Sequence, residues 1–285
     1  MDTKITVEQR ASDMCENLKA LSDYCIQALE AEHLSPDDLY PRNSYLNSLF
    51  IMSIAFSDGI VSLAQKGQLR AFTPLIRSLY ETWINAKLIV ATRSHVWAYH
   101  LMAHGETVRI EKLDRLLADG HTTAANHKVK VKEAKHIISL VKSRYKELPT
   151  IPGVVTTNRS LTRSLKLKQK CQILDYYRSL KTYLPSPTKS ELMVTNYGWV
   201  YNHLSGTPHV DPLALNDLYE RDAAGNWTVD VGGGQDRDYL IKLLHIAYME
   251  QYELLRAWKY YLPVSDETIP QNLKDVFKNI LDKKI

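Results

Sequence analysis

The chain has 285 residues and a formal net charge of +4 at pH 7, with 45% hydrophobic and 24% charged residues, and these proportions exclude an intrinsically disordered chain. Its three cysteines, Cys15, Cys25 and Cys171, offer neither a disulfide framework nor a Cys-x-x-Cys metal site. The N-terminus lacks the pattern of a signal peptide, and polar residues interrupt the longest apolar stretch, 46–64. We therefore expect a cytoplasmic protein with no membrane partner.

Apolar residues recur at three- and four-residue spacing along most of the chain, with caps or breakers between the stretches. This pattern predicts an all-α multi-helix bundle. The predicted helices span about 7–32, 43–67, 68–92, 94–119, 123–148, 161–180, 189–204, 237–261 and 271–283. The first five are expected to form one antiparallel bundle.

The predicted helices are grouped into a single helical domain over 1–285. Within it we distinguish a basic helical segment, 128–189, and a C-terminal helical segment, 236–285. One small β-hairpin insertion is predicted near residues 218–231, turning at Ala224-Gly225-Asn226.

Charge is distributed unevenly along the chain. The segment 128–189 holds fifteen Lys or Arg residues against three acidic residues, a net +12, so the remainder of the chain carries −8. Tyr145, Tyr176, Tyr177 and Tyr183 are interleaved with the basic residues. Basic surfaces with aromatic rings favour RNA binding, whereas a solvated face that complements an acidic partner would have the same composition.

The predicted third helix carries an ionic pair among apolar residues. Arg77 and Glu81 lie one turn apart on it, beside Ile84 and Leu88. A helix that is apolar on both sides is central, so we expect this pair to be desolvated and to be either structural or part of a site.

A second constellation repeats at every fourth residue. Tyr201 and Ser205 share a helix face, and Pro208 places His209 just beyond the helix end. A histidine there can serve as an acid, a base or a hydrogen-bond donor near neutral pH, or it can be structural.

Together, Arg77-x3-Glu81 and Tyr201-x3-Ser205-x3-His209 resemble the marks of an uncharacterised helical bacterial family, domain of unknown function 5677. The resemblance covers about residues 40–260. It implies a helical fold and one pocket that joins these five side chains, and it brings no established activity. Some members of that family sit among phage-defence proteins, which implies the same biology here.

The chain is also similar to the HEPN helical ribonucleases, whose metal-independent site uses Arg-x4–6-His across a dimer. Two pairs have this spacing: Arg115 with His121, and Arg93 with His100 on a predicted polar stripe. His104 and Glu111 continue the same helical stripe, which leaves a metal-binding interpretation and an ordinary solvated helix open beside the ribonuclease.

We therefore predict an RNA-binding protein or a metal-independent HEPN-like ribonuclease effector. Its candidate catalytic residues are Arg77, Glu81, Tyr201, Ser205, His209, Arg93 and His100. RNA would bind the segment 128–189, the protein would form a homo-oligomer, and no cofactor is expected. The alternative is a non-catalytic helical interaction or scaffolding module.

Overall fold

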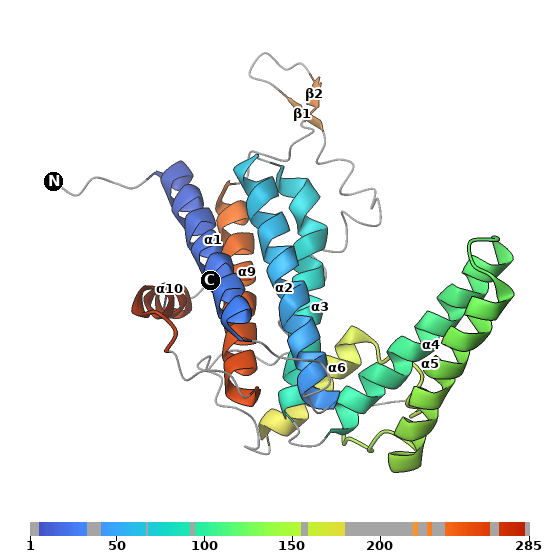
Figure 1. The fold of residues 1–285 in the computed structure, drawn as a ribbon. Helices are drawn as coiled ribbons and strands as arrows, with labels where there is room; N and C mark the ends of the chain where they lie inside the picture. The colour runs from blue at the N-terminus through green and yellow to red at the C-terminus, as the bar shows by residue number, and fades with distance from the viewer. Residues whose placement is uncertain are drawn as a thin grey trace. The chain divides into compact units, whose positions relative to one another are not determined.

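A computed structural model describes residues 6–32, 41–66, 68–91, 95–154, 159–179, 219–221, 227–229, 237–262 and 268–282 (Figure 1). The helices in these ranges are α1 (Val7–Ala31), α2 (Pro41–Gln65), α3 (Leu69–Ala91), α4 (Val96–Ala118), α5 (Ala124–Arg144), α6 (Leu167–Ser179), α9 (Arg237–Tyr261) and α10 (Gln271–Asp282). The predicted helical class is confirmed. The helix predicted over 189–204 lies outside the described residues.

Strand pairing in the described ranges is limited to two short segments. β1 (Tyr219–Arg221) and β2 (Trp227–Val229) pair antiparallel, with Tyr219 opposite Val229. The turn predicted at 224–226 falls between them, outside the described residues.

Contacts divide the chain into two compact units, which are described separately. Unit 1 contains α1, α2 from residue 47 onward, α3 up to residue 86, α9 and α10. Unit 2 contains the start of α2, the end of α3, and α4, α5 and α6. The prediction of one antiparallel bundle from the first five helices is wrong, because α4 and α5 belong to unit 2 while α1 packs along α9 in unit 1. A single domain over 1–285 stays a prediction.

The core of unit 1 is organised around α9. The indole of Trp258 is fully buried, stacks on Phe50 with ring centroids 4.6 Å apart, and donates from Nε1 to Oδ1 of Asn47 at 2.7 Å. Helices α2 and α3 approach closely at Gly59, where a Cβ atom would lie 2.7 Å from Cδ1 of Leu75. Glycine is therefore tolerated inside α2 because its missing side chain admits the neighbouring helix.

Helix α2 is long and apolar enough over Asn43–Gln65 to cross a membrane by length and composition alone. Within its most apolar window, 44% of the residues are buried inside the protein. The core helix of a soluble protein passes the same test, so this one helix is weak evidence for a membrane span.

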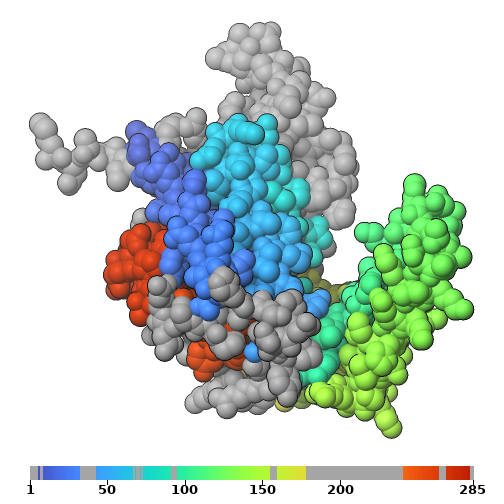
Figure 2. Space-filling model, viewed as in Figure 1, coloured from blue at the N-terminus to red at the C-terminus, as the bar shows by residue number. Residues whose placement is uncertain are grey.

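In unit 2, α4 and α5 form an antiparallel helical hairpin (Figures 1 and 2). Helix α4 ends at Ala118, and Gly120 follows with a φ of +73°, the left-handed conformation that suits glycine. His121 donates its backbone N–H to the carbonyl of Leu116. Thr123 then caps α5 by accepting from the backbone N–H of Asn126. The tight reversal follows from these two local signals.

The basic helix predicted from residue 161 begins later, at Leu167. Residues 160–166 form turns instead, with the backbone N–H of Arg163 donating to the carbonyl of Ser160. The side chains of Leu161 and Leu165 are buried in this segment. Burial of two leucines in a non-helical segment overrides its helical periodicity.

Candidate functional site

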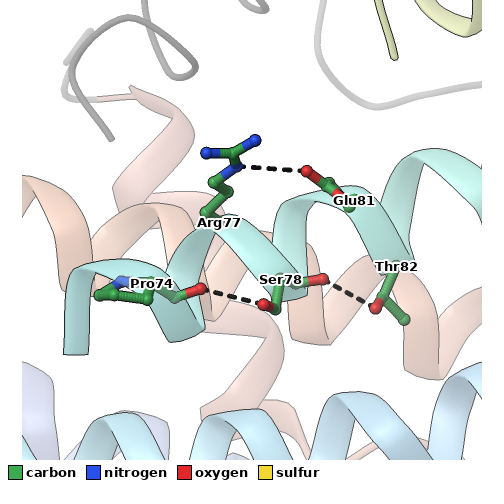
Figure 3. Close-up of polar contacts among 5 residues, drawn as sticks. All are labelled: Pro74, Arg77, Ser78, Glu81 and Thr82. Atoms are coloured by element: carbon green, nitrogen blue, oxygen red, sulfur yellow. Dashed lines mark hydrogen bonds and ion pairs between the residues drawn. The ribbon is translucent and has the colours of Figure 1, made fainter. Parts of the chain in front are cut away.

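Arg77 and Glu81 lie on α3 as an ion pair, with Nε of Arg77 3.3 Å from Oε1 of Glu81 (Figure 3). Helix α3 is buried on most of its circumference, as predicted, with Ile76, Leu79 and Ile84 fully buried. The pair itself is not desolvated, because the Arg77 side chain is 19% exposed and that of Glu81 is 45% exposed. The expected burial of this pair is therefore wrong: its helix position places Glu81 on the rim of the buried surface.

The turns that carry this pair contain a proline. Pro74 lacks a backbone N–H, so it cannot make the hydrogen bond expected inside a helix. Ser78 Oγ donates to the carbonyl of Pro74 at 3.0 Å, and Thr82 Oγ1 donates to the carbonyl of Ser78 at 2.8 Å (Figure 3). These side-chain bonds supply additional local contacts on the side of α3 next to Arg77 and Glu81.

The remaining members of the first constellation are Tyr201, Ser205 and His209. All three lie outside the described residues, and so does Arg93. The pocket joining them to Arg77 and Glu81 therefore stays a prediction.

His100 lies on α4 in the core of unit 2 and has no exposed surface. Its Nδ1 is 3.0 Å from the carbonyl oxygen of Leu161, and because a carbonyl can only accept, Nδ1 carries the proton. Its Nε2 is buried with no hydrogen-bond partner in the described ranges. Burial lowers the pKa of His100 to about 4, against an ordinary value near 6.5, so the ring is neutral at pH 7.

His104, one turn further along α4, repeats this contact. Its Nδ1 is 3.3 Å from the carbonyl oxygen of Thr162. The two imidazoles thus bind successive carbonyls and hold the 160–166 turns against α4. This backbone recognition accounts for the two histidines of the polar stripe. Among the described residues no group of three His, Cys, Asp or Glu side chains could hold a metal ion.

Sequence reasoning missed a pair of buried carboxyl groups on α9. Glu250 and Glu253 are 4% and 6% exposed. Trp83 Nε1 donates to Oε2 of Glu253 at 2.9 Å, whereas Oε2 of Glu250 has no partner within the described residues. Burial first, and the charge of Glu253 second, raise the pKa of Glu250 well above its ordinary value. The signal was the occurrence of Glu250, Gln251 and Glu253 within an otherwise apolar stretch of the helix.

An exposed, strongly basic surface of unit 2 lies on α5. This helix contains six basic residues and one acidic residue. Four of the lysines lie within about 80° of one another around the helix axis and span about 21 Å along it. We call this surface the lysine face; it consists of Lys128, Lys132, Lys135 and Lys142, all exposed.

None of the four lysines of the lysine face forms an ion pair with an acidic side chain in the part of unit 2 that the structure describes. The acidic residue of α5, Glu133, pairs instead with Arg109 of α4 at 3.5 Å. The packed side of α5 is formed by Ala134 and Val141, which are buried against α4. The four ammonium groups are thus turned away from the packed side and remain available to an anionic partner.

The predicted aromatic contribution to this surface is not supported. The Tyr145 ring packs against buried Tyr99, with centroids 5.4 Å apart, and the Tyr176 and Tyr177 rings contact each other at 5.6 Å. Tyr183 lies outside the described residues. The three described tyrosines are thus engaged in ring contacts within unit 2.

The fold and this surface define a helical protein with a basic surface helix. Residues 43–226 match the Family of unknown function (DUF5677), so the chain belongs to that family, as its Arg-x3-Glu and Tyr-x3-Ser-x3-His marks predicted. No curated protein matches the chain. No solved structure matches it either, and the similarity to HEPN ribonucleases is not shown.

Proposed function

We propose that the protein binds RNA through the lysine face of α5. The observation that carries this proposal is the alignment of four exposed, unpaired lysines on one side of a helix that uses its other side for packing. Lysine ammonium groups bind phosphate as mobile point charges and release condensed counterions, which favours association at low salt.

The test is RNA binding by a variant in which all four lysines of the face are changed to glutamine. A matched control changes four exposed or half-exposed lysines of unit 1 and removes the same charge: Lys66, Lys242, Lys274 and Lys278. By fluorescence anisotropy with a labelled 30-nucleotide RNA at low salt, we expect the α5 variant to bind about a hundredfold more weakly. The control variant should bind within about threefold of the wild type. Equal losses in the two variants would mean that net charge alone, and not the lysine face, determines binding.

The burial of His100 favours binding without cleavage at the Arg93–His100 pair. A general acid or base must reach the proton that it transfers, and the His100 ring has no exposed atom in unit 2. Its lowered pKa also leaves very little imidazolium at pH 7.

Ribonuclease activity is tested by incubating the protein with the same RNA in EDTA, beside His100→Ala and His209→Ala variants. Binding without cleavage is our expectation. EDTA-resistant cleavage lost in the His100→Ala variant, with the helical content unchanged, would contradict it and identify a metal-independent ribonuclease. A homo-oligomer and a role in phage defence stay predictions.

A further inference from the structure

The lack of exposed tyrosine and tryptophan rings in the described part of unit 2 limits the kind of RNA that the lysine face can bind. The inference drawn from it rests on the proposed function. Proteins that bind single strands stack successive bases on exposed aromatic rings, which contributes about 1–3 kcal/mol per base. In the described part of unit 2, no tyrosine or tryptophan ring is exposed: Trp97 and Tyr99 are buried, and Tyr145, Tyr176 and Tyr177 are half-buried. The described surface of unit 2 therefore offers positive charge but no exposed tyrosine or tryptophan ring on which a base could stack.

The rest of the exposed side of α5 offers few groups that read base edges: His136, Ser139 and Ser143 are exposed there and can form hydrogen bonds. Val129 and Leu140 are 57% and 53% exposed and follow the lysine face along one flank. Their aliphatic side chains neither donate nor accept hydrogen bonds. With four lysine ammonium groups on this side of α5, we expect most of the binding energy to come from contacts with phosphates.

Contacts with α4 hold both ends of the helix that carries the lysine face. Near its turn, Nε2 of His127 lies 2.7 Å from Oδ1 of Asp114, and at the other end Arg144 Nη1 donates to the hydroxyl of Tyr99 at 2.6 Å. The Arg144 guanidinium also lies over the Tyr99 ring, 5.6 Å from its centroid. With α5 fixed at both ends, the four lysines form a row that spans about 21 Å.

We infer that the lysine face binds the phosphate backbone of duplex RNA in preference to single-stranded RNA, without sequence specificity. A duplex presents phosphates at fixed and high density along a stiff rod, which matches a straight row of cations. A flexible single strand would lose conformational freedom on this row without gaining base stacking in return.

The experiment measures binding of the full chain to a 24-base-pair RNA duplex and to each of its separated strands, at one salt concentration. We expect the duplex to bind at least about fivefold more tightly than either strand, and a duplex of shuffled sequence to bind equally well. The glutamine variant of the lysine face should lose the duplex preference, and the unit 1 control variant should keep it.

Each other outcome overturns a defined part of the account. Single strands that bind as tightly as the duplex, with both lost in the glutamine variant, would refute the duplex preference and leave RNA binding at the lysine face standing. A duplex preference that survives in the glutamine variant would place the site elsewhere. Binding of neither RNA form at low salt would refute the proposed function itself.

Discussion

The two compact units bury ionisable groups of opposite kinds, and in each the pKa shifts towards the neutral form. Unit 1 buries Glu250 on α9, and burial raises the pKa of its carboxyl group. Unit 2 buries His100 on α4, and burial lowers the pKa of its imidazole. Each shift favours the uncharged form, because an apolar interior disfavours charge of either sign. The same physical cause therefore gives the two units opposite responses to pH.

The surfaces of the two units differ as well. Helix α1 in unit 1 carries five acidic and two basic residues, whereas α5 in unit 2 carries six basic and one acidic residue. Helix α9 is buried along most of its length, whereas only Ala134 and Val141 are buried on α5. A helix that packs against a single neighbour keeps most of its surface for a partner, which is why we place the functional surface on unit 2.

The largest expected effect is the loss of packing in unit 1. Trp258→Ala removes a fully buried ring that stacks on Phe50 and leaves Oδ1 of Asn47 without its indole donor. We expect the free energy of unfolding to fall by about 4 kcal/mol, measured by urea denaturation followed by circular dichroism. Trp258→Phe, which retains a ring, should lose about half as much. A loss under about 1 kcal/mol in Trp258→Ala would show that α9 is not central to the core.

The second effect is the acid sensitivity of unit 2. Because the pKa of His100 in the folded protein is about 4, its contribution to stability is complete above pH 6.5 and is lost as the pH falls towards 4. We expect this residue alone to cost about 3 kcal/mol over that interval.

The comparison variant for this effect is His100→Gln, which can still donate to Leu161 but does not titrate. The difference in unfolding free energy between the wild type and this variant should shift by about 3 kcal/mol in favour of the variant between pH 7 and pH 4. A difference that stays constant with pH would contradict the buried neutral imidazole.

Glu250 should respond in the opposite direction. Its folded-state pKa is raised, so its contribution to stability is complete below the ordinary carboxyl pKa and is lost as the pH rises through the folded value. Glu250→Gln keeps the shape and removes the titration, and we expect it to stabilise the protein by about 1 kcal/mol at pH 7. The gain should disappear at pH 4, and a gain that persists there would have to come from packing.

The smallest effect is expected for the partly exposed ion pair on α3. Glu81→Gln should change the unfolding free energy by a few tenths of a kcal/mol, because Glu81 is nearly half-exposed and water screens its attraction to Arg77. The matched control is Asp23→Asn in the exposed pair with Lys19 on α1, which should behave alike. A loss of RNA binding in Glu81→Gln, with stability unchanged, would instead assign the pair to a site.

The sequence predicted the helices well and their partners poorly. Periodicity located α1 and α5 to within a few residues, because this signal is local; in the structure, Thr6 and Thr123 cap the two helices. The assignment of α4 and α5 to a separate unit depends on contacts between distant segments, such as those of His100 and His104 with the 160–166 turns. Helical periodicity cannot reveal such contacts.

The candidate site followed the same pattern. The basic segment was found by counting charges. The positions of its lysines in the sequence already place four of them on one side of a helix. The burial of His100 and the exposure of Glu81 were not predictable, because each depends on which side of its helix meets a neighbour.

The salt dependence of RNA binding tests the central claim most directly. The logarithm of the association constant should fall linearly with the logarithm of salt concentration, and the glutamine variant of Lys128, Lys132, Lys135 and Lys142 should reduce the slope by about 3. The unit 1 control variant should leave the slope of the wild type unchanged. An equal slope in the wild type and the lysine-face variant would contradict the assignment of RNA binding to α5.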